Sequence, residues 1–249
     1  MKKWIWLIAL LSLIGTAVLL PLLPESVPMH YDLAGSVDRW GSKYENLIFP
    51  ILILLIALIL TLLINYYEKK ARDRDKVTHA STATTSQSGT TNEKARAEAL
   101  SNAKVLGIVG LATVLLFFVM QAFILYGAYT GAKAGATTAT IDIGRVSCIC
   151  LGVLLVIAGN FMPKTRTNGV LGVRCSWSMY NETTWKKSNR FGGVALLLAG
   201  LLTILTALLV PNSLWALLAM LCYLLLALLL TLLYTHNIYV KEEFPNGDR

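Results

Sequence analysis

The feature that most constrains this chain is a series of six apolar stretches, each long enough to cross a lipid bilayer as a helix. They cover residues 4–23, 47–67, 105–129, 141–162, 191–210 and 214–234. A hydrocarbon core about 30 Å thick is crossed by roughly 20 apolar residues in helical conformation. Helices also satisfy their own backbone hydrogen bonds where no water is present. The sequence therefore predicts an all-α fold, a polytopic membrane helical bundle with about six transmembrane helices.

The composition excludes several classes of soluble protein. Only 14% of the residues are charged and 55% are hydrophobic, with a mean hydropathy of +0.61. An average soluble domain carries about 25% charged residues, so a soluble enzyme, a coiled coil or a disordered chain does not fit. The formal net charge of +8 does not indicate direct nucleic acid binding either, because the basic residues follow the pattern of membrane topology.

Most of the 22 Lys and Arg residues lie in alternate connections, within residues 1–3, 68–104, 163–190 and 235–249. The other connections contain only Arg39, Lys43, Lys133 and Arg145. By the positive-inside rule, this bias predicts that both termini are cytoplasmic. The first stretch is predicted to be a span and not a secretory signal, because it exceeds the roughly 7–15 apolar residues of a signal peptide.

The same pattern divides the chain into four parts. Residues 1–68 are predicted to form an N-terminal two-helix unit with a patterned extracellular loop, and residues 103–236 a four-helix unit. Residues 69–102 include a run rich in Thr and Ser and are predicted to be a flexible cytoplasmic linker. Helix-forming residues from Glu93 onward predict a helical stalk below the third span. Residues 237–249 form a polar cytoplasmic tail.

Within the spans, no Asp, Glu, Lys or His lies near the expected midplane. Proton and ion pathways usually need such groups, which argues against a proton-coupled transporter. Gln121 and Asn160 are the uncharged polar residues in or near spans, and interhelical hydrogen bonds are their predicted role. A small-molecule transporter or permease is the alternative function, and it requires a cavity that both residues line.

The first outer loop combines prolines, glycines and polar residues in a way that predicts a defined conformation. Its candidate ligand-binding residues are Pro28, His30, Asp32, Gly35 and Asp38. Three of them, His30, Asp32 and Asp38, are possible metal ligands, but three residues without a fixed geometry do not predict a metal site. No serine or cysteine has a base at a catalytic spacing. The chain is therefore predicted not to be an enzyme and to need no cofactor.

The loop after the fourth span is the second patterned region, with tryptophans beside basic residues. That composition is typical of the membrane interface and of contact with anionic lipid. Ser178 or Asn181 is predicted to cap a short amphipathic helix that carries Trp185 and Arg190 along the inner leaflet. Cys175 in this loop and the other three cysteines are expected to be reduced.

Several motifs in this region resemble one family of membrane proteins. The sequence reads G-N-F-M-P-K at residues 159–164 and N-E-T-x-W-x-x-x-N-R-x-G at residues 181–192, a pattern similar to the SdpI family of bacterial membrane proteins. Residues 23–30 read L-P-x-x-V-P-x-H and resemble the small domain of unknown function that often precedes it. The residues that carry the cytoplasmic motif are Asn160, Pro163, Lys164, Asn168, Gly172, Arg174, Trp177, Trp185, Asn189 and Arg190.

The resemblance implies a multi-pass protein of the bacterial plasma membrane that gives resistance to a secreted antimicrobial peptide toxin, or senses it. In the family's namesake system the protein also acts as a receptor that holds a DNA-binding repressor at the membrane. Membrane lipid, a peptide toxin and such a repressor are therefore the expected partners.

Overall fold

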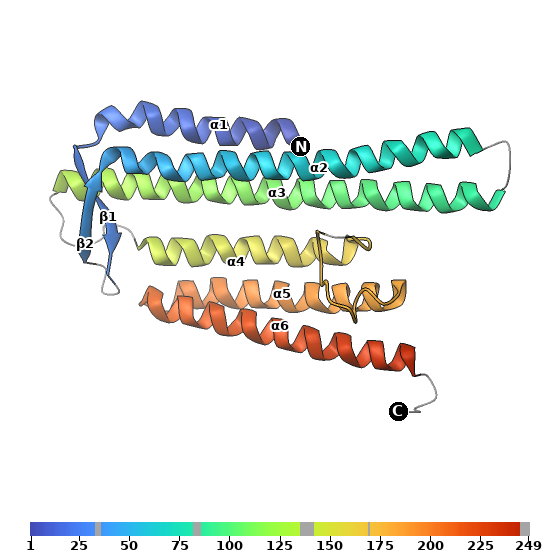
Figure 1. The fold of residues 1–249 in the computed structure, drawn as a ribbon. Helices are drawn as coiled ribbons and strands as arrows, with labels where there is room; N and C mark the ends of the chain where they lie inside the picture. The colour runs from blue at the N-terminus through green and yellow to red at the C-terminus, as the bar shows by residue number, and fades with distance from the viewer. Residues whose placement is uncertain (33–35, 82–85, 135–141, 169, 245–249) are drawn as a thin grey trace. The chain divides into compact units, whose positions relative to one another are not determined.

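The computed structural model describes residues 1–32, 36–81, 86–134, 142–168 and 170–244. Figure 1 traces its elements along the chain. The helices are α1 (Lys2–Leu19), α2 (Ile48–Ser81), α3 (Ser86–Ala134), α4 (Ile143–Phe161), α5 (Glu182–Leu209) and α6 (Ser213–Glu243). Short 3-10 helices lie at η1 (Leu20–Leu22), η2 (Lys43–Leu47) and η3 (Met162–Lys164). Six helices in the described residues are long and apolar enough to span a membrane, so the predicted helical membrane bundle is confirmed.

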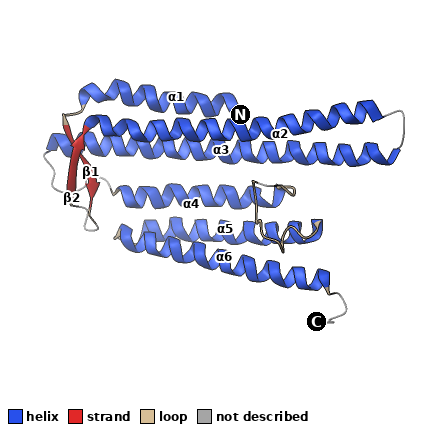
Figure 2. Cartoon of the chain, viewed as in Figure 1, coloured by secondary structure: helices blue, strands red, loops and turns tan. Residues whose placement is uncertain are grey.

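The patterned loop between the first two spans is a β-hairpin, which the sequence did not predict. Strands β1 (Ser26–Tyr31) and β2 (Val37–Ser42) pair antiparallel and are the red arrows in Figure 2. The register is irregular between Pro28 and His30 and again between His30 and Tyr31. Pro28 has no N–H to donate to the ladder, so an irregular register near it has a physical cause.

Helices α2 and α3 reach far into the segment that was predicted to be a flexible linker. Residues 69–102 are helical wherever the structure describes them. The charged residues of this segment suggest a solvated linker in the sequence, but several of them pair between the two helices. Arg96 Nη1 lies 3.0 Å from Asp75 Oδ1, and Arg74 Nη1 donates to Asn92 Oδ1 at 3.3 Å. The helical stalk predicted from Glu93 is thus part of α3. The four-part division of the chain remains a prediction.

Two compact units share the helices. One consists of Met1–Leu58, Gly110–Leu154 and Gly200–Cys222, and the other of Ile59–Val109, Leu155–Ala199 and Tyr223–Arg249. In the first unit, a Cβ at Gly152 would lie 2.9 Å from the Gly200 carbonyl oxygen. In the second, a Cβ at Gly159 would lie 2.6 Å from the Gly193 carbonyl oxygen. These glycines allow α4 and α5 to approach closely, as small residues do between membrane helices.

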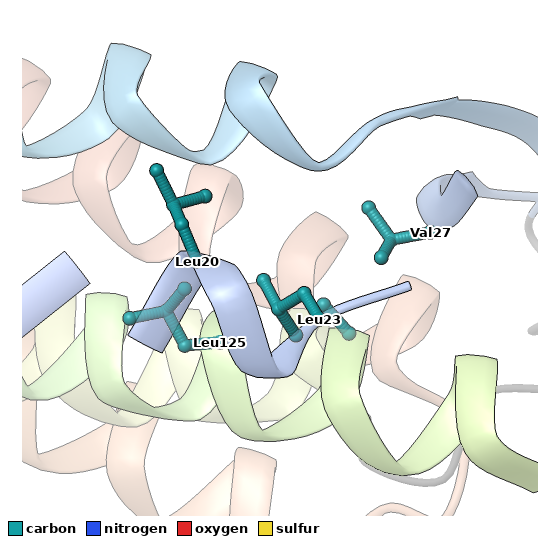
Figure 3. Close-up of a cluster of buried hydrophobic side chains, with 5 residues drawn as sticks. Leu20, Leu23, Val27 and Leu125 are labelled. Atoms are coloured by element: carbon teal, nitrogen blue, oxygen red, sulfur yellow. The ribbon is translucent and has the colours of Figure 1, made fainter. Parts of the chain in front are cut away.

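The hairpin rests on a small apolar core of the first unit. Val27 of β1 is fully buried and packs with Leu20 and Leu23, which follow α1, and with Leu125 and Ala128 of α3. Figure 3 labels four of these side chains, Leu20, Leu23, Val27 and Leu125. The large apolar side chains on the outer faces of the helices are exposed, among them Val18, Leu209 and Leu225, as expected of surfaces that contact acyl chains.

Candidate functional site

The hairpin is fixed to the start of α2 by a short network of charged and polar groups. Ser42 caps η2, and its backbone N–H donates to Glu45 Oε1 at 3.1 Å in a capping box. The second carboxylate oxygen of Glu45 accepts from Arg39 Nη2 on β2. Lys43 Nζ donates to Glu25 Oε1 at 2.8 Å and so connects η2 with the residue before β1. Each end of the hairpin is therefore held in place.

Two of the predicted outer-loop residues meet on the hairpin. His30 Nδ1 lies 2.6 Å from Asp38 Oδ1, and both side chains are largely exposed, at 65% and 44%. Asp32 Oδ1 accepts from the Ser36 backbone N–H at 2.8 Å. Pro28 is buried and is therefore not part of the exposed surface. Gly35 lies outside the described residues.

Among the residues that the structure describes, no group of three or more His, Cys, Asp or Glu side chains lies close enough to hold a metal ion. The hairpin exposes an imidazole and a carboxylate, and the ring of Trp40 on β2 is exposed as well. Such a surface can bind a polar or amphipathic ligand by hydrogen bonds and ring stacking.

The connection between η3 and α5, residues 165–181, is here called the α4–α5 loop. Asn168 organises it from the inside, because its Oδ1 accepts from the backbone N–H groups of Val170 at 2.7 Å and Leu171 at 2.6 Å. The same oxygen accepts from the hydroxyl of Tyr67 on α2 at 3.1 Å. Its Nδ2 donates to the carbonyl oxygens of Arg166 and Leu171. One buried side chain thus replaces the regular backbone pairing that the loop lacks.

Asn189 on α5 holds the middle of the loop. Its Oδ1 accepts from the Val173 backbone N–H at 2.8 Å, and its Nδ2 donates to the Trp185 carbonyl oxygen one helical turn earlier. Gly172 lies directly against it with a φ of 98°, and a Cβ at this position would overlap Asn189 Oδ1. Both the backbone conformation and the available space therefore require glycine here.

Trp185 is a buried structural residue, and the prediction that it lies at the lipid interface is wrong. Its side chain is 1% exposed, and its indole Nε1–H donates to the Thr165 carbonyl oxygen at 3.1 Å. The short helix predicted around it is the beginning of the spanning helix α5 and not a separate element. Its predicted cap is confirmed, because Asn181 Oδ1 accepts from the Thr184 backbone N–H at 2.8 Å.

Charged side chains surround this buried framework. Glu182 Oε2 lies 2.7 Å from Lys94 Nζ on α3, and Glu182 Oε1 lies 2.8 Å from Lys186 Nζ one turn along α5. Arg166 of the loop lies 4.0 Å from the same carboxylate. Trp177 stacks edge-on against His236 of α6, with 4.7 Å between ring centroids. The loop is therefore connected to α3, α5 and α6 within one unit.

The structure divides the predicted cytoplasmic-motif residues into two groups. Asn168, Gly172, Trp185 and Asn189 meet in the loop's framework, and Pro163 packs near Gly193. Outside the framework, Asn160, Pro163, Lys164, Arg174 and Arg190 are exposed, and Trp177 is half-buried. Sequence reasoning missed further members of the framework, namely Tyr67, Asn102, Thr165 and Thr184, and it named Ser178 only as an alternative helix cap.

A cavity of about 380 Å³ lies between α1 and α3 in the first unit, and its lining is predominantly apolar. Gln121 lines it and donates from Nε2 to Thr16 Oγ1 and to the Asn46 carbonyl oxygen, both at 3.2 Å. The predicted interhelical hydrogen bonds of Gln121 are thereby confirmed. Asn160 is exposed on α4 and does not line this cavity, so the arrangement required for the transporter alternative is not met here.

The fold and these two polar regions define a multi-pass helical membrane protein whose spans are joined by a short hairpin and a hydrogen-bonded loop. Residues 164–235 match the SdpI/YfhL protein family, and residues 7–54 match a domain of unknown function, DUF1648. The resemblance seen in the sequence is confirmed over these two regions. The SdpI/YfhL match contains the whole α4–α5 loop, and the DUF1648 match contains the whole hairpin.

One characterised relative is the "Immunity protein SdpI" of Bacillus subtilis (strain 168), which is 31% identical over 109 residues. The alignment covers 44% of this chain and 50% of the relative, so the chain spans about half the length of that protein. No solved structure matches the chain.

Proposed function

We propose that this chain is a bacterial plasma-membrane protein that gives resistance to a secreted antimicrobial peptide toxin, or senses it. The observation that carries the proposal is the match of residues 164–235 to the SdpI/YfhL family, together with 31% identity to a protein described as an immunity protein. The fold supports it, because a membrane-active peptide must be met by a protein that is itself in the membrane.

In this proposal the hairpin faces the outside and carries His30 and Asp38 toward the arriving peptide. The α4–α5 loop faces the cytoplasm, as the distribution of basic residues predicts. The framework of the loop depends on side chains from α2, α3 and α5. A peptide that shifts one of these helices therefore alters the loop, which gives a route from binding to a cytoplasmic signal.

The exposed loop residues Arg174 and Arg190 would present positive charge to a cytoplasmic partner. The candidate partner is a DNA-binding repressor held at the membrane. This chain would contact the repressor protein and not the nucleic acid that the repressor binds. Anionic lipid headgroups at the inner leaflet would compete with such a partner for these two arginines.

The experiment is a killing assay in a Bacillus subtilis strain that lacks its own immunity protein and is exposed to the peptide toxin which that protein resists. Expression of the full chain is expected to restore survival, compared with the empty vector as the negative control and the native immunity protein as the positive control. Unchanged killing, with the chain shown to be present in the membrane fraction, would refute resistance to this peptide.

A further inference from the structure

The basic residues around the α4–α5 loop fall into two groups. Residues 163–190 contain six of them and a single acidic residue, Glu182. Glu182 pairs with Lys186 at 2.8 Å, and Arg166 lies 4.0 Å from the same carboxylate. Lys187 pairs with Glu242 at 3.2 Å. The three others are exposed and have no carboxylate partner in the part of the chain that the structure describes, namely Lys164, Arg174 and Arg190.

Two of these unpaired cations, Lys164 and Arg190, lie at the same end of the contact between α4 and α5. A Cβ built on Gly193 of α5 would lie 2.9 Å from Pro163 Cδ, so the two segments touch here. Lys164 follows Pro163 directly, and Arg190 lies one helical turn before Gly193. The contact between the helices therefore brings the two cations into the same region of the surface.

The positions of both cations along their helices place them at the depth of lipid headgroups. Lys164 is the last residue of the candidate span Ile143–Lys164, and Arg190 is the last charged residue before the apolar stretch 191–210. Side chains of a helix lean toward its N-terminus, so the Arg190 guanidinium is carried away from the apolar stretch and toward the headgroups.

The face of α5 that carries Arg190 continues as an exposed apolar surface. Val194 and Leu198 follow Arg190 at intervals of four residues, which places all three on one face of the helix. The two apolar side chains are 53% and 52% exposed. Arg174 differs, because it lies in the α4–α5 loop and outside any helix. The face thus changes from a cation to a lipid-facing surface within about one helical turn.

This combination selects one kind of ligand. A phosphate group can accept two parallel hydrogen bonds from an arginine and another from a lysine ammonium, while an acyl chain covers the apolar side chains below. A zwitterionic headgroup would bring an ammonium group as well. Glu182, the single carboxylate in this stretch, already pairs with Lys186 and with Lys94. The charges therefore favour a headgroup that carries a phosphate and no cation.

We infer that Lys164 and Arg190 bind the phosphate of an anionic phospholipid whose acyl chain lies along Val194 and Leu198 of α5. Phosphatidylglycerol belongs to this class, since it carries a net negative charge and no ammonium group. The inference goes beyond the proposed function and does not depend on resistance to a toxin. It decides the competition for Arg190 in favour of lipid and leaves Arg174 to a cytoplasmic partner.

The test uses the full chain in nanodiscs of phosphatidylcholine that contain a small fraction of phosphatidylglycerol with a photoreactive diazirine in its acyl chain. After illumination and digestion, mass spectrometry locates the cross-linked lipid along the chain. Labelling is expected on the segment of α5 that contains Val194 and Leu198. Phosphatidylcholine with the same photoreactive chain should label this segment at least about fivefold less, since each Lys or Arg contributes about 1 kcal/mol to the attraction of anionic lipid.

Variants of the two cations separate this site from general attraction to a basic surface. Arg190→Gln should lower the labelling of the segment by phosphatidylglycerol about fivefold, and Lys164→Gln should have a similar effect. Arg190→Lys keeps the charge and should retain most of the labelling. Lys187→Gln is the matched control on the same helix, because it removes a cation that already pairs with Glu242. It should leave the labelling unchanged.

Equal labelling of the segment by the two lipids would overturn the inference. Equal labelling of the Arg190→Gln and Lys187→Gln chains would also overturn it, and would return Arg190 to the cytoplasmic partner. An excess of inorganic phosphate, compared with chloride at the same ionic strength, separates the two sources of phosphate. Labelling that persists supports a lipid site, whereas labelling lost only with phosphate would assign the site to the free ion. Elution volume and melting temperature in detergent check that Arg190→Gln folds, and Lys164→Gln decides if it does not.

Discussion

The hairpin and the α4–α5 loop both connect spanning helices and are both rich in polar residues, but they use those residues in opposite ways. On the hairpin, His30 and Asp38 form a single exposed pair. In the loop, Asn168 and Asn189 are buried, and their amide groups bond to backbone N–H and carbonyl groups on both sides. The polar atoms of the His30–Asp38 pair are directed to water, whereas those of Asn168 and Asn189 are directed to the chain itself.

This difference separates two reasons for a dense polar motif. An exposed pair of charged groups contributes between zero and about 1 kcal/mol to stability, so stability does not explain the presence of His30 and Asp38. A buried backbone N–H left without its acceptor costs about 1–3 kcal/mol, so stability alone explains Asn168 and Asn189. The hairpin is therefore the better candidate for recognition, and the loop's buried residues are the better candidates for maintaining one conformation.

The largest expected change in the free energy of unfolding comes from substituting a glycine of the loop, with a glycine of the hairpin as the control. Gly172→Ala in the loop places a Cβ on a backbone with a φ of 98° and against Asn189 Oδ1. The strained conformation and the loss of the Val173 hydrogen bond together should lower the free energy of unfolding by about 3 kcal/mol. The measurement is unfolding of the purified chain in mixed micelles with increasing SDS.

The matched control for this prediction is Gly41→Ala on β2. A Cβ there would meet Met29 Cγ at 2.6 Å and Glu45 Oε1, so both side chains must move aside and the exposed capping bond from the Ser42 N–H to Glu45 is lost. The expected loss is about 1 kcal/mol. A loss at Gly41 as large as that at Gly172 would contradict the view that the hairpin tolerates local change better than the loop.

A pair of tryptophans gives the next largest effect. Trp185→Phe keeps an aromatic ring in the loop's framework but removes the indole N–H that donates to the Thr165 carbonyl oxygen. Because both groups are buried, the free energy of unfolding should fall by about 2 kcal/mol. Trp40→Phe on the hairpin, where the side chain is 45% exposed, should leave it nearly unchanged. Similar losses for the two variants in the same SDS titration would show that exposure does not distinguish the regions.

Much of the fold could be predicted from the sequence, because hydropathy over twenty residues dominates the placement of a membrane helix. The hairpin could not be predicted in the same way. Its strands contain Pro28 and Asp38, residue types that are depleted in strands. Burial of Val27 among side chains from η1 and α3 stabilises it, and that packing depends on a contact distant in sequence. The polar stretch after the second span was likewise not predicted to be helical, because its charged side chains pair between α2 and α3.

The candidate site was predictable only in part. His30 and Asp38 were identified as neighbours in one loop, but their 2.6 Å contact depends on strand pairing. Gly172, Asn168 and Asn189 were identified by resemblance to a family and not by their physical chemistry. Their roles follow from a backbone path that only the folded chain defines. Trp185 shows the reverse case. Its basic neighbours predicted a ring at the membrane interface, whereas the ring is buried and its indole N–H donates to the Thr165 carbonyl oxygen.

The smallest expected effect on stability is also the sharpest test of the comparison. Asp38→Asn removes the charge that faces His30 on a side chain that is 44% exposed, and should change the free energy of unfolding by less than about 0.5 kcal/mol. If the hairpin is the recognition surface, this variant should lose most of its protection in the killing assay while its amount in the membrane stays the same.

Lys187→Gln is the matched control, since it removes the charge of another exposed ion pair, with Glu242 at 3.2 Å, outside both the hairpin and the α4–α5 loop. Full protection by Asp38→Asn would remove the Asp38 carboxylate from the recognition surface. Loss of protection by Lys187→Gln as well would show that killing responds to surface charge in general, and the functional contrast between the two connections would then have no basis.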